Sequence, residues 1–251
     1  YQHPQIKLTT VTGRSSAGEK LSEVFPHLAN LNLTITPELD GSVDVVFSAL
    51  PHKASAEAVI PLVEQGIKTI DISADFRLKS TEEYSQWYGV DHPDPSYLNK
   101  SVYGLTEIHR QAISQSRLIA NPGCYPTSAI LGLAPAVSRG IISEDIIIDS
   151  KSGVSGAGRS LALTTHYSEV NENVMAYSLG GHRHLPEIVQ ELGDLTDTTL
   201  NITFLTHLIP MTRGILSSCY APLKAPYDKT ETDIRELYQQ FYKDSPFVQI
   251  T

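Results

Sequence analysis

The sequence predicts an α/β fold in two parts: a parallel-sheet domain over residues 1–122 and an α+β domain with a mostly antiparallel sheet over residues 123–251. Strand-like and helix-like runs alternate in the first part, which is typical of right-handed crossovers between parallel strands. In the second part strand-like runs follow one another closely, as they do in antiparallel sheets. A chain of 251 residues is long enough for two domains of ordinary size.

Apolar runs in the first part define its predicted strands: 6–11, 43–50, 67–73 and 117–120. The run 43–50 is apolar enough to be buried on both faces of a sheet. A helix is predicted over 53–65 and ends at Gly66, a residue type that commonly stops helices. Because parallel sheets bind ligands at the carboxyl ends of their strands, the loops after these strands are candidate ligand sites.

The second part begins with a helix after Cys124, whose apolar residues recur at helical spacing: Ile130, Leu131, Ala134 and Val137. Strands are predicted over 146–152, 201–209 and 214–223. Only residues 210–213 separate the last two strands, so these are predicted to pair as an antiparallel hairpin. A cap at 230–233 predicts a final helix with one apolar face: Ile234, Leu237, Tyr238 and Phe241.

Composition narrows the class of protein. A net charge of −9 disfavours non-specific binding to nucleic acid. The sequence has no run of 18 apolar residues and begins with polar residues, which predicts neither a membrane span nor a signal peptide. Its two cysteines, Cys124 and Cys219, lack the spacing of a metal site, so the sequence predicts no metal, no disulfide framework and a reducing cytoplasm.

The run 121–127, Asn-Pro-Gly-Cys-Tyr-Pro-Thr, lies where a predicted strand becomes a predicted helix. Cys124 therefore meets unpaired N–H groups and the positive end of a helix dipole, a setting that favours a reactive thiolate. Pro126 suits the first helical turn, and Gly123 allows a substrate to approach the backbone closely. The alternative is a buried structural cysteine after a Pro-Gly turn.

A thiolate enzyme needs an acid or base beside its nucleophile. The run 179–188 places two of the nine histidines, His182 and His184, on either side of an arginine, after two glycines and directly before a helix. If this segment is extended, the two rings point apart, and only one is expected to face Cys124. Both are candidate catalytic residues, and the alternative is a polar turn with a capping histidine.

Two turn-rich loops are candidates for binding a cofactor. After an early strand of a dinucleotide-binding sheet, an acid binds the ribose of NAD, whereas an arginine accommodates the 2′-phosphate of NADP. The loop 13–16, which follows the first predicted strand, contains an arginine and two serines and no acidic residue, and this favours NADP(H). A second, glycine-rich loop can press its backbone against a flat ring or an anion, although both loops could be ordinary surface turns. The cofactor-binding candidates are Gly13, Arg14, Ser15, Ser16, Pro51, Ser155, Gly156, Ala157 and Gly158.

Cationic side chains that flank turns are candidates for binding an anionic substrate. Arg183, between the two histidines, and Arg213, beside a proline and a glycine, are predicted to bind it bidentately. Arg77 and Asn121 lie in loops that follow predicted strands and complete the candidate substrate site.

Together these motifs resemble the N-acetyl-gamma-glutamyl-phosphate reductase family, whose broader relatives are the aspartate-semialdehyde dehydrogenases. The resemblance runs through almost the whole chain. Besides 13–18, 121–127 and 151–159, it rests on the runs 49–52, 71–78, 87–89, 102–105, 169–173, 181–184 and 210–215.

The resemblance implies a Rossmann-like NADP-binding domain and a catalytic domain that forms a homo-oligomer, a tetramer or dimer, through the apolar face of its sheet. It implies NADPH-dependent conversion of N-acetyl-L-glutamyl 5-phosphate to the semialdehyde and inorganic phosphate, in arginine biosynthesis. Cys124 would form a thioester, one of His182 and His184 would act as acid or base, and Ser155 to Gly158 would lie near the nicotinamide. The family's first strand and glycine-rich loop are expected before Tyr1, and a C-terminal segment that returns to the cofactor domain is expected after Thr251.

Three other functions remain open from the residues alone. The substrate could be aspartyl phosphate or the aminoadipyl analogue, since one methylene changes specificity by only about 1–3 kcal/mol. A non-catalytic nucleotide-binding protein would keep the fold but leave Cys124 and the paired histidines without a purpose. A cysteine hydrolase would leave the parallel sheet and Arg14 unexplained.

Overall fold

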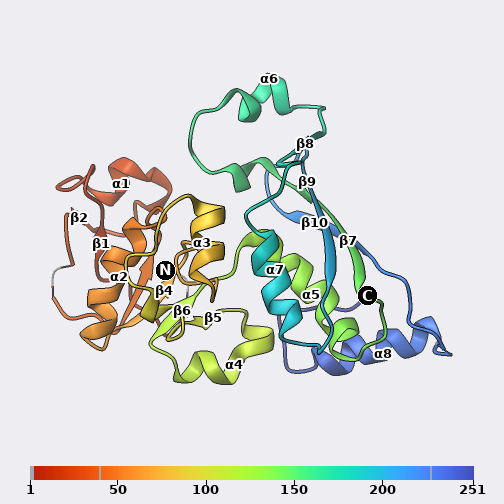
Figure 1. Ribbon diagram of the computed structural model, residues 1–251. Coiled ribbons are helices and arrows are strands. Elements are labelled where there is room, and N and C mark those ends of the chain that lie inside the picture. Colours follow the sequence, from red (N-terminus) through yellow and green to blue (C-terminus); the bar gives the residue numbers. More distant parts are fainter. Residues whose placement is uncertain (1–2, 40, 227) are drawn as a thin grey trace. The chain divides into compact units, whose positions relative to one another are not determined.

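The computed structural model describes residues 3–39, 41–226 and 228–251, and the chain divides into two units, Tyr1–Val46 and Phe47–Thr251. The first unit contains two short parallel strands, with Val11 opposite Ile35 (Figure 1). A short helix and a 3₁₀ turn connect them, and Leu21 and Ile35 are its buried apolar side chains. The elements are β1 (Val11–Thr12), α1 (Leu21–Val24), η1 (Pro26–Leu28) and β2 (Ile35–Thr36).

The predicted strand 6–11 is wrong over most of its length, because only its last residue belongs to β1. Ile6 and Leu8 are 49% and 40% exposed, so apolar character in this run does not reflect burial. Strand β2 was not predicted, since two residues are too short a run to show an alternating pattern.

The second unit begins with a four-stranded sheet in the order β3-β4-β6-β5, in which β4, β6 and β5 run parallel. Its strands are β3 (Val45–Ser48, which starts at the end of the first unit), β4 (Lys68–Asp71), β5 (Val102–Tyr103) and β6 (Leu118–Ala120). Its helices are α2 (Ala54–Glu64), α3 (Thr81–Tyr88), η2 (Pro95–Tyr97) and α4 (Thr106–Gln115). The prediction of a parallel α/β sheet is confirmed.

Strand β3 differs from its prediction in one respect. Val45 and Phe47 are 41% and 59% exposed, so the strand is not buried on both faces. Because β3 is the edge strand of the described sheet, only one side of it pairs with a neighbour. The apolar core of this sheet lies against α2, where Ala56, Val59 and Leu118 are buried.

A second four-stranded sheet follows, in the order β10-β7-β9-β8. Two of its three pairings are antiparallel and the central pairing, β7 with β9, is parallel, which confirms the prediction of a mostly antiparallel sheet. The strands are β7 (Asp145–Ser152), β8 (Met175–Tyr177), β9 (Asn201–Leu208) and β10 (Ile215–Tyr220).

The predicted hairpin between the last two strands is wrong. Strand β7 lies between β9 and β10, with Ser152 opposite both Leu208 and Ile215. The link between β9 and β10 crosses the end of β7, where the N–H of Gly153 donates to the carbonyl oxygen of Gly214 over 2.9 Å. Two strand spacings amount to about 10 Å, a span that a link of this length covers easily.

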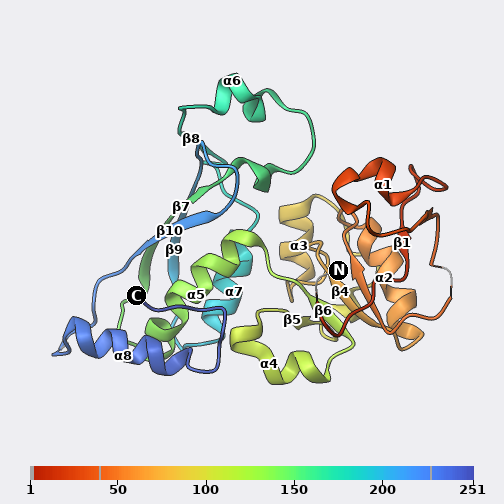
Figure 2. The same cartoon turned by 180° about the vertical axis from the view of Figure 1, so that it is seen from behind.

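Helices α5 (Cys124–Ser138) and α7 (Leu185–Gly193) lie together against one face of this sheet (Figures 1 and 2). The core between them contains Ile130, Leu133, Ile148 and Ile188. Helix α8 (Glu231–Phe241) lies against α5 on the apolar face that the sequence predicts, and the Tyr238 hydroxyl donates to the Gly132 carbonyl oxygen over 2.8 Å. In the part of the chain that the structure describes, no helix is long and apolar enough to cross a membrane.

Between β7 and β8 the chain makes a long excursion, residues 153–174, that extends beyond the end of the sheet (Figures 1 and 2). It contains three short turns of helix, η3 (Val154–Ala157), η4 (Leu163–Thr165) and α6 (Tyr167–Val170).

Candidate active site

Cys124 is the first residue of α5, four residues after β6 ends, as the sequence predicts. Its side chain is exposed, whereas those of Tyr125 and Pro126 are buried in the core. Gly123 caps the helix in an extended conformation, with φ −64° and ψ 154°. A negative charge on the sulfur is therefore stabilised by the helix N-terminus while remaining within reach of a ligand.

The ring of His184 lies directly against the backbone of Gly123. A Cβ atom added to Gly123 would be 2.7 Å from His184 Nε2 and 3.0 Å from Glu187 Oε2. Only glycine permits so close an approach, since real Cβ atoms do not come nearer than about 3 Å. The absence of a side chain at Gly123 therefore allows the His184 imidazole to pack against the backbone directly before Cys124.

The two histidines lie side by side, so the prediction that they point apart is wrong. Their ring centroids are 4.8 Å apart, and both rings contact the edge or face of Tyr125. The reason is local: His184 is not extended but helical, with φ −86° and ψ −10°. Its N–H donates to His182 Nδ1 over 3.1 Å, in the turn that opens α7.

Both imidazoles are neutral at physiological pH. Burial, followed by the charge of Arg183, lowers the pKa of His182 to about 4. Burial, followed by the charges of His182 and Arg77, lowers the pKa of His184 to about 2. Because His182 Nδ1 accepts a hydrogen bond, its proton is on Nε2. Nδ1 of His184 is buried without a partner among the described residues.

A buried carboxylate lies beneath the cysteine turn. Glu187 is 1% exposed, and its Oε1 accepts hydrogen bonds from Gly123 N–H over 2.7 Å and from the Tyr103 hydroxyl over 2.6 Å. Burial raises the pKa of Glu187, and Arg77 and these two donors offset part of that effect. Glu187 has no predicted role, because a glutamate on a helix is ordinarily solvated and its partners here come from other parts of the chain.

Arg77 connects the turn before Cys124 to the parallel sheet through hydrogen bonds. Its Nη1 lies 3.4 Å from Glu187 Oε2, its Nε donates to the Asn121 carbonyl oxygen over 2.7 Å, and its Nη2 donates to the Ile72 carbonyl oxygen over 2.8 Å. The side chain is only 8% exposed. Asn121 is half-buried, and its side-chain amide donates to the Pro122 carbonyl oxygen over 3.1 Å.

Two phenols lie beside the thiol. The hydroxyls of Tyr125 and Tyr177 are 2.6 Å apart, and Tyr177 belongs to β8. Burial raises the pKa of each phenol, and a negative charge on the neighbouring Cys124 acts in the same direction. Tyr177 was not predicted, because its place here depends on strand pairing with β9.

A cavity of about 400 Å³ opens beside these groups, and it is lined by Trp87, Tyr177, Ser178, Gly181, His182 and Arg183. Gly181 has φ +127°, and a Cβ atom there would lie 3.1 Å from the Trp87 ring. Arg183 is exposed, and its Nη1 lies 3.2 Å from His52 Nε2. Burial and the charge of Arg183 lower the pKa of His52, so its neutral ring can accept this bond.

The glycine-rich loop and Arg213 are neighbours. The N–H groups of Val154 and Ser155 donate to the carbonyl oxygens of Met211 and Thr212 over 2.8 and 3.0 Å. Gly153 packs against the backbone of Arg213, whose side chain is exposed. The cofactor candidates in this loop, Ser155, Gly156, Ala157 and Gly158, are exposed residues.

The other cofactor candidates lie elsewhere in the chain. Gly13, Arg14, Ser15 and Ser16 follow β1 in the first unit, where Gly13 N–H donates to the Thr36 carbonyl oxygen over 2.9 Å and Arg14 is exposed. Pro51 is exposed between β3 and α2 in the second unit.

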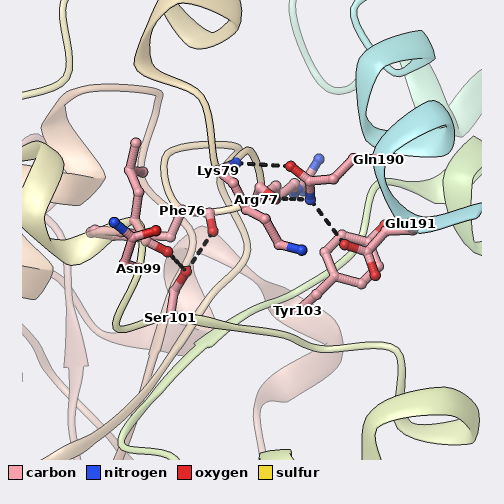
Figure 3. Close-up of a pocket in the computed structure, with 9 residues that line it drawn as sticks. Phe76, Arg77, Lys79, Asn99, Ser101, Tyr103, Gln190 and Glu191 are labelled. Carbon is pink, nitrogen blue, oxygen red and sulfur yellow. Dashed lines mark hydrogen bonds between the residues drawn. The ribbon is translucent and has the colours of Figure 1, made fainter. Parts of the chain in front are cut away.

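A smaller cavity of about 110 Å³ lies next to Arg77 (Figure 3). Gln190 Oε1 accepts from Lys79 N–H over 2.8 Å, and Gln190 Nε2 donates to the Arg77 carbonyl oxygen over 2.9 Å. These bonds, visible in Figure 3, fasten α7 to the segment that carries Arg77. The lining contains neither a thiol nor an imidazole.

Two family models match the chain. Residues 1–116 match the semialdehyde dehydrogenase NAD binding domain, and residues 124–251 match the semialdehyde dehydrogenase dimerisation domain. Among solved structures, an aspartate semialdehyde dehydrogenase II from Vibrio cholerae in complex with ASA has a TM-score of 0.65 at 16% identity, over 97% of this chain and 72% of that one. An aspartate semialdehyde dehydrogenase with NADP from Candida albicans has a TM-score of 0.62 at 15% identity, over 94% and 69%. At these identities the likeness shows the fold alone.

Curated relatives are much closer in sequence. The N-acetyl-gamma-glutamyl-phosphate reductase of Dehalococcoides mccartyi (strain CBDB1) is 55% identical over 250 residues, which cover 99% of this chain and 73% of the relative. The enzyme of the same name from Geobacillus stearothermophilus is 48% identical over 255 residues, or 100% of this chain and 73% of the relative. The chain therefore belongs to the N-acetyl-gamma-glutamyl-phosphate reductases, a group within the semialdehyde dehydrogenase family.

Proposed function

We propose that this protein reduces N-acetyl-γ-glutamyl phosphate to the semialdehyde, with release of inorganic phosphate, through a thioester on Cys124. The observation that carries the proposal is an exposed thiol at a helix N-terminus, with two neutral imidazoles packed against the residues on either side of it, Gly123 and Tyr125. The 55% identity to a reductase of that name supports the choice of substrate.

In the first step the Cys124 thiolate attacks the acyl carbon, a C–S bond forms, and the C–O bond to phosphate breaks. Negative charge gathers on the acyl oxygen in the transition state. The backbone N–H groups of Cys124 and Tyr125, in the first turn of α5, are available as donors because no helical carbonyl precedes them. Such a donor is worth about 3 kcal/mol of transition-state stabilisation.

We assign the acid–base role to His182 and a positioning role to His184. His182 lines the large cavity and its Nε2 bears an exchangeable proton, whereas His184 is 8% exposed and is pressed against Gly123. An acyl phosphate carries about two negative charges near neutral pH. These charges stabilise the imidazolium that forms when neutral His182 takes the thiol proton of Cys124, and His182 returns this proton to the sulfur when the cysteine leaves the reduced carbon.

The residues that we assign to NADP(H) have the chemistry that it requires. Arg14 is exposed beside two serines, a suitable set for a 2′-phosphate, and a Cβ added to Gly158 would meet nothing within 4 Å, so that loop leaves room for a ring. When bound, NADPH supplies the hydride that reduces the thioester carbon.

We assign Arg183 to the carboxylate of the substrate, because it is exposed at the large cavity and His52 orients it. Arg213 is assigned to the departing phosphate beside the glycine-rich loop. Arg77 and Asn121 shape the turn rather than contact the substrate, because the three donor nitrogens of Arg77 are engaged within the protein.

We also propose a homo-oligomer that forms through the open face of the second sheet. Leu216, Tyr220 and Ile147 on that sheet are 60%, 59% and 48% exposed, and large exposed apolar areas mark interaction sites. The division of the chain at 122/123 into cofactor and catalytic domains remains a prediction.

The substrate is tested by phosphate-dependent reduction of NADP⁺ with three aldehydes: the semialdehydes of N-acetylglutamate, aspartate and aminoadipate. We expect kcat/KM to be highest with the first, by about tenfold or more over an analogue that differs by a methylene. Equal or higher turnover of another aldehyde would reject the substrate assignment. No turnover with any of them would reject the enzymatic function.

A further inference from the structure

Hydrogen-bond donors face both ring nitrogens of His52. The N–H of Ala74 donates to Nδ1 over 3.3 Å, and Nη1 of Arg183 lies 3.2 Å from Nε2. Burial, followed by the charge of Arg183, lowers the pKa of His52, so the ring is neutral at physiological pH. A neutral imidazole has one N–H group and only one acceptor nitrogen. In either tautomer, therefore, one of these two contacts brings two donors together.

An oxyanion bound between Arg183 and Nε2 of His52 removes this conflict. The guanidinium and the Nε2–H group would both donate to the anion, while Nδ1 would keep the hydrogen bond from the Ala74 N–H. Two such donors side by side match the two oxygens of a carboxylate, and a guanidinium is well suited to that geometry. The contacts of the ring therefore indicate a ligand that has negatively charged acceptor oxygens.

The loop that carries His52 is held in a strained conformation. Lys53, with φ +67° and ψ −52°, is the centre of a γ-turn of the rare type, which the Ala54 N–H closes by donating to the His52 carbonyl oxygen over 2.8 Å. The buried carboxylate of Asp75 stabilises this turn, because it accepts hydrogen bonds from the N–H groups of Lys53 and Ala56 over 2.9 and 2.8 Å. Strain of this kind clusters at sites that clamp ligands. The position of His52 is therefore preformed.

Helix α3 connects His52 to the large cavity of the candidate active site. Tyr88, the last residue of the helix, packs against the His52 ring, with ring centroids 4.9 Å apart. The residue before it, Trp87, lines the large cavity together with His182 and Arg183. An anion bound by His52 and Arg183 would therefore lie at the margin of the cavity that contains the assigned acid–base histidine.

We propose that His52 is a substrate-binding residue, which donates from Nε2 to the same substrate carboxylate that Arg183 binds. This carboxylate is at the end of the substrate away from the acyl phosphate, so the pair would select for it without taking part in the chemistry. The identity of the anion rests on the proposed function. A phosphate of NADP(H) is the competing anion, because His52 follows the cofactor candidate Pro51, and the experiment separates the two.

The binding is tested by calorimetric titration of the complete protein with four probes: N-acetylglutamate, its α-amide, inorganic phosphate and NADP⁺. His52→Phe keeps an aromatic ring beside Tyr88 and removes both nitrogens. We expect the Kd for N-acetylglutamate to rise about tenfold or more in this variant, which is the effect of losing one hydrogen bond to a charged group. The preference of wild type for N-acetylglutamate over the amide should fall by the same factor. The Kd values for phosphate and NADP⁺ should not change.

Two further variants are controls. His52→Gln keeps an N–H donor near the position of Nε2 and should restore most of the affinity for N-acetylglutamate. His27→Phe makes the same change at an exposed histidine in the first unit and should bind all four probes like wild type.

An unchanged Kd for N-acetylglutamate in His52→Phe overturns the proposal. A loss of affinity confined to phosphate or to NADP⁺ also overturns it, and would assign His52 to that anion. If His52→Phe does not fold, ¹⁵N NMR of the histidine rings in wild type decides. With N-acetylglutamate bound, we expect the His52 proton on Nε2, with Nδ1 as the acceptor. A complex with the proton on Nδ1 alone would overturn the proposal.

Kinetics separate this role from the proposed function. In His52→Phe the KM for N-acetylglutamate semialdehyde should rise about tenfold or more while kcat changes little, because a contact made equally in the ground state and the transition state affects KM alone. A fall in kcat at unchanged KM would overturn the substrate-binding role. If wild type turns over none of the three aldehydes, the proposed function fails, while calorimetry still decides whether His52 and Arg183 bind a carboxylate.

Discussion

Glu187 accepts a hydrogen bond from the backbone N–H of Gly123, the residue directly before Cys124, over 2.7 Å. The two residues are 64 positions apart in the chain, and they join α7, which carries the histidines at its start, to the turn that carries the cysteine. Arg77 forms an ion pair with the same carboxylate, which fixes its position further. The position of the histidines relative to the cysteine turn therefore depends on a buried carboxylate.

Glu187→Gln should lower kcat by about 10²-fold, because a small displacement of reacting groups has effects of that size. It should also destabilise the fold by about 3 kcal/mol, since Arg77 loses its buried partner. A stability loss alone does not identify a positioning role. The deciding measurement is the rate at which iodoacetamide alkylates Cys124 in the folded variant, which we expect to change.

The matched control is Glu191→Gln, on the same helix. Glu191 is equally buried but pairs with His109, over 2.8 Å, and not with the cysteine turn. The Glu191→Gln substitution should lower the free energy of unfolding by about 1 kcal/mol and leave the alkylation rate of Cys124 unchanged. Equal effects of the two variants on alkylation would contradict the positioning role.

The sequence predicts local features of this site well and long-range features poorly. The turn at Cys124 is recognisable because a strand, a Pro-Gly pair and a helical repeat follow one another without interruption. The role of Glu187 is not recognisable, because it arises from contacts with Gly123, Tyr103 and Arg77 in three other parts of the chain. A charged residue on a helix is ordinarily solvated, and nothing local to position 187 indicates its burial.

The same limit explains the errors in the fold. Strands β9 and β10 look like a hairpin because they are close in sequence, but pairing with the apolar strand β7 separates them. An extended segment would turn the two histidine rings apart, whereas a single helical residue, His184, turns them to the same side. In both cases the structure is decided by contacts between segments that are distant in the chain or by a local turn, and the apolar pattern of the sequence does not contain them.

Gly123→Ala should disturb the site through contact alone, since φ −64° suits alanine as well as glycine. The new Cβ would overlap His184 Nε2 and Glu187 Oε2, at 2.7 and 3.0 Å. We expect a large fall in kcat with a smaller change in KM. Gly193→Ala, at the end of α7, meets nothing within 4 Å and should retain activity and stability. Wild-type turnover in Gly123→Ala would show that the close packing is dispensable.

Cys124→Ser should abolish turnover while NADPH binding, followed by fluorescence, remains close to wild type. A hydroxyl is a much weaker nucleophile than a thiolate at neutral pH. Cys219→Ser is the control: burial raises the pKa of that thiol to about 11, so it is unreactive. Substantial turnover in Cys124→Ser, or a complete loss in Cys219→Ser with an intact fold, would reject the assignment of the nucleophile.

Arg14→Ala should weaken the binding of NADPH more than the binding of NADH, because only NADPH has a 2′-phosphate for the guanidinium to bind. The loss of one charge-assisted contact corresponds to about 1.5–3 kcal/mol, or roughly a tenfold to hundredfold rise in KM for NADPH. Steady-state kinetics with each cofactor measure it. Equal losses with both cofactors would remove the role in binding the 2′-phosphate.

The buried, neutral His184 should make the protein less stable as the pH falls. Its pKa is about 2 in the folded state against 6.5 in the unfolded chain, so below about pH 6.5 only the unfolded chain takes up a proton. The contribution of His184 is fully present above pH 6.5 and decreases as the pH falls. Between pH 8 and pH 5 the free energy of unfolding should lose about 2 kcal/mol through this residue.

His184→Gln cannot titrate, so urea unfolding of this variant from pH 8 to pH 5 should lack that part of the decrease, whatever its stability at pH 8. His27→Gln, which changes an exposed histidine, should keep the wild-type slope. Identical slopes for wild type and His184→Gln would mean that His184 is protonated in the folded protein. In that case the ring would carry a charge beside Gly123, and its packing there would have to depend on an anion that balances it.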